Sequence, residues 1–150
     1  MFRFGMIDGV LAVGGDGTFS QVVNGILKRA QADAEIKLHL SPKDTMKPGS
    51  YVKSPVPIAH IPAGTQNGLA YSITGTTEAT TAILHVILGH VMGLDVTSVH
   101  DANTGKFLRF SAVALAYGSA ADGALEAERN RWMGPWRYFV AGARVVQRHR

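Results

Sequence analysis

The chain has 150 residues, no cysteine and a formal net charge of +4. With 46% hydrophobic and 17% charged residues, it has the composition of a globular chain and not of a disordered one. The lack of cysteine excludes disulfides and thiolate metal sites. No apolar run is long enough to span a membrane, and the N-terminus carries no signal-peptide pattern. We therefore expect a cytoplasmic protein that could still bind a membrane at its surface.

The first predicted elements are a strand and a helix joined by a glycine-rich corner. Residues 9–13 form an apolar run that is typical of a buried parallel strand. Apolar residues then recur at helical spacing, at Phe19, Val22, Val23, Ile26, Leu27 and Ala30. Between them lies Gly14-Gly15-Asp16-Gly17-Thr18. Backbone N–H groups beside a helix N-terminus favour bound phosphate, but the corner could also be a tight turn in which Asp16 only caps the helix.

A second strand and a second glycine-bearing corner are predicted further along. Residues 31–57 lack periodicity and are read as a long surface insertion. Within it, residues 36–40 could be a short strand or the start of a loop, and we expect His39 at the surface. Residues 58–61 then form a short buried strand that ends in a turn over residues 62–68. Two such corners would line one crevice at the carboxyl ends of parallel strands; two ordinary loops are the alternative.

The pattern then changes from helical to alternating. Residues 79–90 form a predicted helix, which Thr76 or Thr77 could cap. Period-two alternation begins at residue 91, and a turn cluster and a second strand-like run follow at residues 101–105 and 106–117. This succession predicts a β-hairpin. We therefore expect the chain to enter a second, β-rich subdomain.

The end of the chain is basic. A short helix is predicted at residues 125–130 and a longer one at residues 136–147, with Pro135 at its start. In the longer helix, apolar residues occupy one face and arginines the other. From residue 129 onward there are six arginines and no acid, which suits phosphate, nucleotide or an anionic lipid face. A solvated arginine-rich helix is the alternative. Three aromatic residues could touch lipid, although packing is their commoner use: Trp132, Trp136 and Tyr138.

Several stretches resemble one superfamily. The corner at residues 14–18, with Val22-Val23-Asn24-Gly25 after it, resembles the nucleotide loop of the diacylglycerol kinase and sphingosine kinase superfamily, and NAD kinases share its five residues. Residues 61–65 are similar to the superfamily's second nucleotide-side motif. Three further stretches are similar to the ceramide kinase branch: residues 82–89, 94–100 and 128–134. The resemblance implies an α/β fold, in which a partial doubly wound nucleotide-binding domain runs into the start of a β-rich second domain.

The resemblance also implies a function. It implies a lipid kinase that uses ATP and Mg²⁺ to phosphorylate the primary hydroxyl of ceramide at a membrane surface. Residues 1–90 would be the catalytic domain with its insertion, and residues 91–150 the start of a lipid-binding domain with a basic helix, both incomplete. A diacylglycerol or sphingosine kinase, or a catalytically silent lipid- or nucleotide-binding module, is the alternative. We expect no nucleic-acid partner and leave the oligomeric state open.

Site residues follow from the same resemblance. Asp16 matches the essential carboxylate, as the base that accepts the hydroxyl proton or as a ligand on the magnesium side. Asp122 matches the acidic position that recognises the sphingoid lipid. Eight residues match positions that hold nucleotide phosphates: Gly14, Gly15, Gly17, Thr18, Gly64, Thr65, Arg131 and Arg137. Two positions depart from the family, because Gln21 stands where Glu is usual and Gly68 where an acid is frequent. The family's upstream phosphate loop and its lipid-binding sandwich are also missing, so we expect a fragment.

Overall fold

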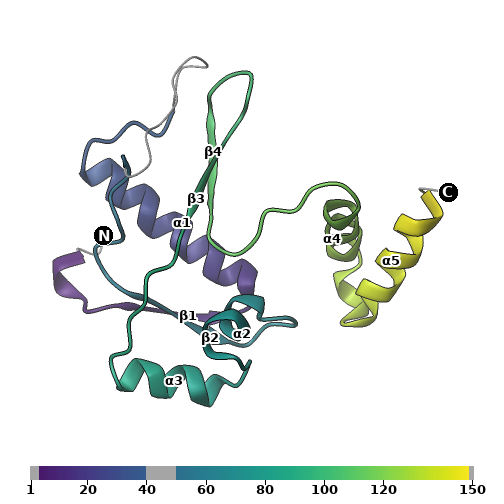
Figure 1. Ribbon diagram of the computed structural model, residues 1–150, viewed down its shortest axis with the longest axis horizontal. Coiled ribbons are helices and arrows are strands. Elements are labelled where there is room, and N and C mark those ends of the chain that lie inside the picture. Colours follow the sequence, from purple (N-terminus) through teal and green to yellow (C-terminus); the bar gives the residue numbers. More distant parts are fainter. Residues whose placement is uncertain (1–3, 40–49, 149–150) are drawn as a thin grey trace. The chain divides into compact units, whose positions relative to one another are not determined.

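The computed structural model describes residues 4–39 and 50–148. It divides the chain into two compact units, Met1–Val113 and Ala114–Arg150. Among the described residues, the first unit contains two small sheets and three α-helices, and the second has helices as its regular elements (Figure 1). No helix in the described ranges combines the length and the apolar character that crossing a membrane requires.

The first unit is built on a strand–helix–strand arrangement. Strand β1 (Val10–Gly14) pairs in parallel with β2 (Ile58–Pro62), and helix α1 (Asp16–Asp33) follows β1 directly. A short 3-10 turn, η1 (Phe4–Met6), precedes β1. The parallel pair with its helices confirms the predicted α/β class. The helix is longer than its apolar pattern, because its first turn begins in the glycine corner itself.

Strand β1 is covered on one face only. Ala12 is 2% exposed and belongs to the hydrophobic core. The other buried members of this core are Phe19, Val23 and Leu27 of α1, Leu69, and Phe107, Phe110 and Ala112 at the second sheet. Leu11 and Val13 are 58% and 62% exposed. The prediction of a fully buried strand is therefore wrong for this chain, since α1 packs against one face and leaves the alternate side chains open.

Two helices follow β2. Helix α2 (Gly68–Thr74) begins in the second glycine-bearing corner, and α3 (Ala79–Ile87) comes next. The predicted helix over residues 79–90 ends early, since the backbone turns at Gly89 with φ +69°. Neither threonine occupies the cap position of α3, which belongs to Glu78. Thr76 instead accepts a hydrogen bond from the Glu78 N–H at 3.2 Å.

The insertion is tied to the end of α1. Gln31 is 0% exposed, and its side-chain amide pairs with both backbone groups of Val52, at 2.9 Å and 3.0 Å. Residues 31–33 are helical, so the insertion begins later than predicted. Residues 36–39 form neither helix nor strand, and residue 40 lies outside the described residues. His39 is exposed, as predicted, and accepts the Phe107 N–H at 3.1 Å.

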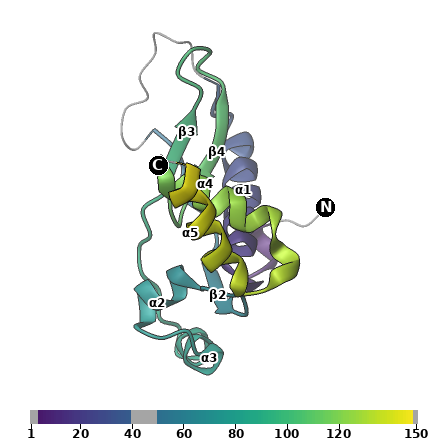
Figure 2. The same ribbon diagram turned by 90° about the vertical axis from the view of Figure 1, so that its right-hand side faces the viewer.

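The predicted hairpin exists but is shorter than its sequence pattern. Strand β3 (Thr97–His100) pairs antiparallel with β4 (Phe107–Ser111), and α1 lies alongside the pair in both ribbon views (Figures 1 and 2). Residues 91–96 and 112–117 alternate in sequence without forming strand, because alternation predicts two faces but not a partner. Asn24 fastens the hairpin to α1 by bonding the backbone N–H and carbonyl of Phe110, at 2.8 Å and 2.7 Å.

The second unit is a helical hairpin. Helix α4 (Ser119–Arg129), the 3-10 turn η2 (Arg131–Met133) and α5 (Trp136–Arg148) succeed one another, and α4 and α5 lie side by side (Figures 1 and 2). The longer predicted helix is confirmed, and Pro135 directly precedes it. Helix α4 starts six residues before the predicted residue 125, at Ser119.

Two arginines of α5 reach a buried carboxylate of α4. Glu126 of α4 is 5% exposed, and Arg144 of α5 forms an ion pair with its carboxylate. Arg129 and Arg148 approach the same carboxylate at 3.8 Å. The hydrogen bond from Arg144 is the main influence that holds the pKa of Glu126 below its usual value of 4.5. A buried carboxylate requires such partners, so these arginines stabilise the hairpin, while their own side chains remain 50–63% exposed.

We predict that this unit loses stability in acid. Because the folded pKa of Glu126 lies below 4.5, the unfolded state binds the proton first, so the stabilisation falls as the pH drops from 4.5 through the folded pKa. Both tryptophans of the chain, Trp132 and Trp136, belong to this unit. These side chains are 83% and 72% exposed in the folded unit, so their emission would change little on unfolding, and the far-UV circular dichroism of the helices, followed from pH 7 to pH 3, measures the loss.

Two variants test whether the Glu126 carboxylate causes this acid sensitivity. Glu126→Gln should lower the helical circular dichroism signal already at pH 7 and remove the acid step. Glu128→Gln is the matched control, because its side chain is 61% exposed in a pair with Arg131 and such pairs contribute little. An acid step that persists in Glu126→Gln would refute the assignment.

Candidate functional site

The two glycine corners touch each other. Strands β1 and β2 end side by side, with Gly14 opposite Pro62, so the loops leave the same edge of the sheet. A Cβ atom added to Gly64 would lie 2.3 Å from the Cα atom of Gly15. Gly14 has φ +155°, and a Cβ atom there would lie 2.6 Å from the Thr18 hydroxyl oxygen. Only glycine fits this approach, since either added carbon would overlap its neighbour.

Asp16 joins the two corners. It is the first residue of α1, and its carboxylate accepts the N–H groups of Gly68 at 2.9 Å and Leu69 at 3.0 Å. These are backbone donors of the first turn of α2, 52 and 53 residues further along the chain. Asp16 thus caps α2 and not its own helix, whose cap position is Gly15. The expectation that Asp16 caps α1 is therefore wrong, while the tight turn at Gly14 is present.

Asn67 shapes the second corner, and sequence reasoning missed it. Its backbone is left-handed at φ +53° and the residue is 8% exposed. Its side-chain oxygen accepts the Gly64 N–H at 2.8 Å, and its amide donates to the Gly64 carbonyl at 2.9 Å. Asparagine directly before a glycine in a turn is a signal for such a left-handed position, so the sequence could have indicated this role.

The first turn of α1 remains available to a ligand. The opening N–H groups of a helix have no partner within the helix and carry its positive dipole end. Gly17 and Thr18 lie in this turn and are both exposed. A Cβ atom on Gly17 would meet nothing within 4 Å. Thr65 is also exposed, on the facing loop. The corner therefore offers donors and open space, which suits an anion such as phosphate.

The carboxylate of Asp16 also fits a magnesium ion held mainly by phosphates. Within residues 4–39 and 50–148, no group of three or more histidine, aspartate or glutamate side chains could hold a metal by itself. Each oxygen of Asp16 keeps a lone pair beyond its backbone hydrogen bond. Magnesium in phosphate sites uses one or two carboxylates, with phosphate oxygens and waters completing its shell. The residues present are compatible with that arrangement.

The remaining predicted site residues lie in the other unit, on three elements. Asp122 is in the first turn of α4. Arg131 of η2 pairs with Glu128 at 3.0 Å. Arg137 of α5 donates a hydrogen bond to the Tyr138 hydroxyl at 2.9 Å, and its guanidinium carbon lies 4.8 Å from the centroid of the Tyr138 ring. The structure brings the glycine corners and Asp16 together, whereas the roles of these three residues on phosphate and lipid stay predictions.

Comparison with known proteins points to one family. Residues 3–99 match the diacylglycerol kinase catalytic domain. The chain is 39% identical to ceramide kinase of Mus musculus and 37% identical to that of Homo sapiens, in each case over 142 residues, which are 95% of this chain and 25% of the relative. It is 37% identical to sphingosine kinase 2 of Arabidopsis thaliana over 144 residues, 93% of this chain and 26% of that protein. The chain thus spans about a quarter of the length of these relatives.

Two alanine substitutions should show which glycine of the corners is required for packing. Gly64→Ala forces the corners apart, and overpacking of this kind costs about 1–3 kcal/mol. Gly17→Ala meets no atom within 4 Å and should leave the stability unchanged or raise it by up to about 1 kcal/mol, because alanine is the better helix former. Urea unfolding followed by circular dichroism measures both, because the tryptophans lie in the other unit. A Gly64→Ala chain with undiminished stability would contradict the close contact of the corners.

Proposed function

Because the chain belongs to the diacylglycerol kinase catalytic domain family, we propose that it is part of an ATP-dependent lipid kinase acting on ceramide. The observation that carries the proposal is the closure of two glycine corners by Asp16, beside an open helix N-terminus. Residues 1–90 would supply the nucleotide site. Residues 91–150 would begin the part that meets the lipid.

The proposed reaction is transfer of the γ-phosphoryl group of ATP to the primary hydroxyl of ceramide. Positioning and charge stabilisation supply most of the catalysis in such transfers. The first-turn N–H groups of α1 would bind phosphate oxygens, with Gly64 and Thr65 facing them. Magnesium, when bound, would neutralise charge on the phosphates. Asp16 would accept the hydroxyl proton or hold the magnesium, in a direction fixed by its two backbone hydrogen bonds.

The choice of ceramide rests on the sequence stretches at residues 82–89, 94–100 and 128–134 that are similar to the ceramide kinase branch. Sphingosine kinases of Arabidopsis thaliana are similar to the chain at 35–37% identity, so sphingosine is the second candidate substrate. A catalytically silent module is the third candidate, because Gln21 replaces a usual glutamate.

Transfer of labelled phosphate from ATP to ceramide, sphingosine and diacylglycerol tests the function. The assay uses this chain and a version extended at both ends to the length of its relatives. We expect labelled ceramide from the extended form. Product only from sphingosine or diacylglycerol would reassign the substrate, and ATP or lipid binding without any product would establish the silent module.

Asp16→Asn should reduce the transfer rate by about 100-fold or more, the range expected for loss of a proton-transfer group. The variant also loses one hydrogen bond to α2, which costs about 1–3 kcal/mol. Val23→Ala is the matched control, because Val23 is 3% exposed on the same helix and its truncation destabilises without touching the corner. Equal losses of activity in the two variants would assign Asp16 a purely structural role.

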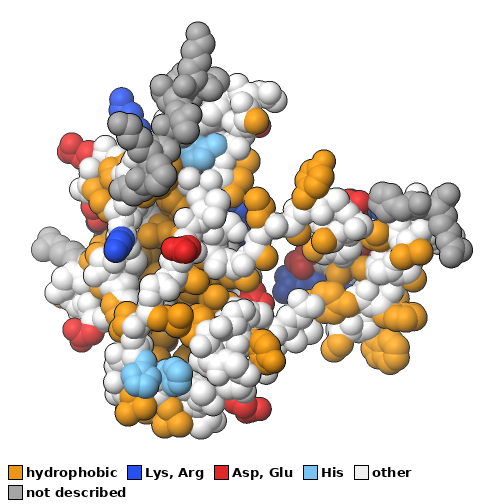
Figure 3. Space-filling model, viewed as in Figure 1, with side chains coloured by type: hydrophobic (Ala, Val, Ile, Leu, Met, Phe, Trp, Pro, Cys, Tyr) orange, Lys and Arg blue, Asp and Glu red, His pale blue; other side chains and the backbone are white. Residues whose placement is uncertain are grey.

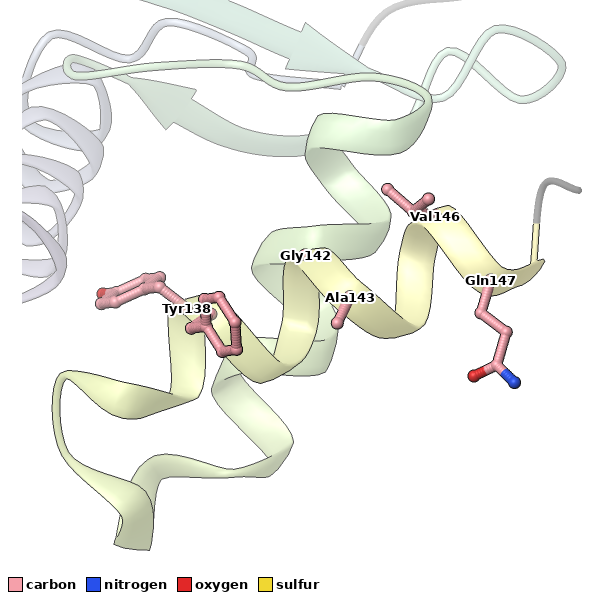
Figure 4. Close-up of a pocket in the computed structure, with 6 residues that line it drawn as sticks. Tyr138, Gly142, Ala143, Val146 and Gln147 are labelled. Carbon is pink, nitrogen blue, oxygen red and sulfur yellow. The ribbon is translucent and has the colours of Figure 1, made fainter.

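We also propose that the protein works at the cytoplasmic surface of a membrane, since ceramide resides in bilayers and ATP in the cytosol. The support is the outer face of α5, where Tyr138, Gly142, Ala143, Val146 and Gln147 line a shallow apolar hollow (Figure 4). Hydrophobic side chains are visible on the surface of this unit (Figure 3). Trp132, Trp136 and Phe139 are 83%, 72% and 75% exposed. Exposed aromatics on an arginine-bearing helix are typical of interfacial helices.

Vesicle binding tests this surface. Transfer of Trp132 and Trp136 into phosphatidylserine-containing vesicles should shift their fluorescence to shorter wavelength. Phe139→Glu should weaken binding by about tenfold, since it places a charge on the inserted face. Leu108→Glu is the matched control, because Leu108 is 51% exposed in the other unit. The absence of a shift with the unmodified chain would exclude this face as a lipid contact.

A further inference from the structure

His60 is a buried polar residue next to the first glycine corner. It lies in β2 opposite Ala12 and is 8% exposed. Its Nε2 atom is 2.9 Å from the Gly14 carbonyl oxygen, and its ring packs on Phe19 at 5.2 Å between centroids. Its Nδ1 atom is buried without a hydrogen-bond partner among the described residues.

Packing alone does not account for a histidine at this place. A buried nitrogen without a partner costs free energy, and the flanking residues of the strand core, such as Ile58 and Ile61, are aliphatic. An aliphatic side chain at residue 60 would fill the same space without that cost. What the imidazole adds is its one hydrogen bond. Because the Gly14 carbonyl can only accept, Nε2 carries the hydrogen.

The Gly14 carbonyl is therefore held by two donors. The Ala63 N–H donates to it at 2.9 Å, and His60 donates at 2.9 Å. In a planar trans peptide the carbonyl and the N–H point in opposite directions. Fixing the oxygen of the Gly14–Gly15 peptide thus fixes the direction of the Gly15 N–H. Glycine on both sides makes this peptide easy to rotate without such a restraint.

We propose that His60 is a positioning residue that keeps the Gly14–Gly15 peptide oriented so that the Gly15 N–H faces bound phosphate. The inference rests on the proposed function, since it requires a nucleotide at the corner. His60 acts through the backbone of Gly14 and touches neither the nucleotide nor the lipid. Its contribution is to the affinity for ATP and not to folding.

Binding of ATP with magnesium, measured by titration calorimetry on the full chain, tests the proposal together with urea unfolding. His60→Leu should weaken ATP binding by about tenfold, which is the typical loss when one hydrogen-bond donor, here the Gly15 N–H, no longer points at the ligand. The variant should be at least as stable as the unmodified chain. His60→Gln can donate from a similar distance and should bind within about threefold of the unmodified chain. Leu27→Ala, a core variant on α1 with an 8% exposed side chain, should lower stability without changing ATP affinity.

If His60→Leu binds ATP more weakly but is at least as stable as the unmodified chain, the positioning role is supported, because loss of a purely structural residue would lower both affinity and stability. If the unmodified chain binds ATP and His60→Leu binds it equally well, the inference is overturned while the proposed function stands. If the unmodified chain binds no ATP, the same titrations are made on the form extended at both ends; if that form binds no ATP either, the proposed function fails, and the inference fails with it. If His60→Leu does not fold, unimpaired affinity in His60→Phe, which also lacks a donor, overturns the inference, and a tenfold loss supports it.

Discussion

The contact between the two glycine corners governs the geometry around them. Parallel pairing places Gly14 opposite Pro62, so both loops leave one edge at a separation that admits only hydrogen at Gly64. The carboxylate of Asp16 then spans the gap to the N-terminus of α2. Charge-assisted hydrogen bonds of this kind are among the stronger ones in proteins. Much of the glycine–aspartate motif is thus required by the fold before any ligand is considered.

Local sequence signals predicted the parts of this arrangement but not its closure. Apolar runs and glycines were sufficient for both strands, for α1 and for the two corners, because those signals lie within a few residues of the elements they form. The partner of Asp16 is 52 residues away, and the partner of Asn24 is 86 residues away. Periodicity carries no information about such pairs. The same limit explains the shortened hairpin, in which alternation continued beyond the paired residues.

In the second unit, the charge pattern of the sequence did not predict which face of a helix packs. Sequence periodicity separated an arginine face from an apolar face on α5, but it did not indicate which face would pack. In the structure the packed face carries the buried Ala141 and Val145, and Arg144 and Arg148 beside them pair with Glu126 of α4, which is 5% exposed. Three arginines at the basic end of the chain thus approach Glu126, while half or more of each of these side chains stays exposed. An external surface of this unit would therefore combine exposed aromatic side chains with arginines.

The glycines of the first corner do not all serve the same purpose. Gly14 is required by the close approach of Thr18, so its identity follows from packing, and a Cβ atom on Gly15 would be tight, at 3.1 Å from the Gly64 Cα atom. Gly17 differs, since it has no left-handed backbone and an added Cβ atom would meet nothing within 4 Å. Inside a helix, alanine would be preferred there on backbone entropy. A ligand oxygen approaching the first-turn N–H groups would account for glycine at this position, because a methyl group would stand in its path. Within the corner, packing therefore explains the residues that close the site, and Gly17 marks the side from which phosphate would enter.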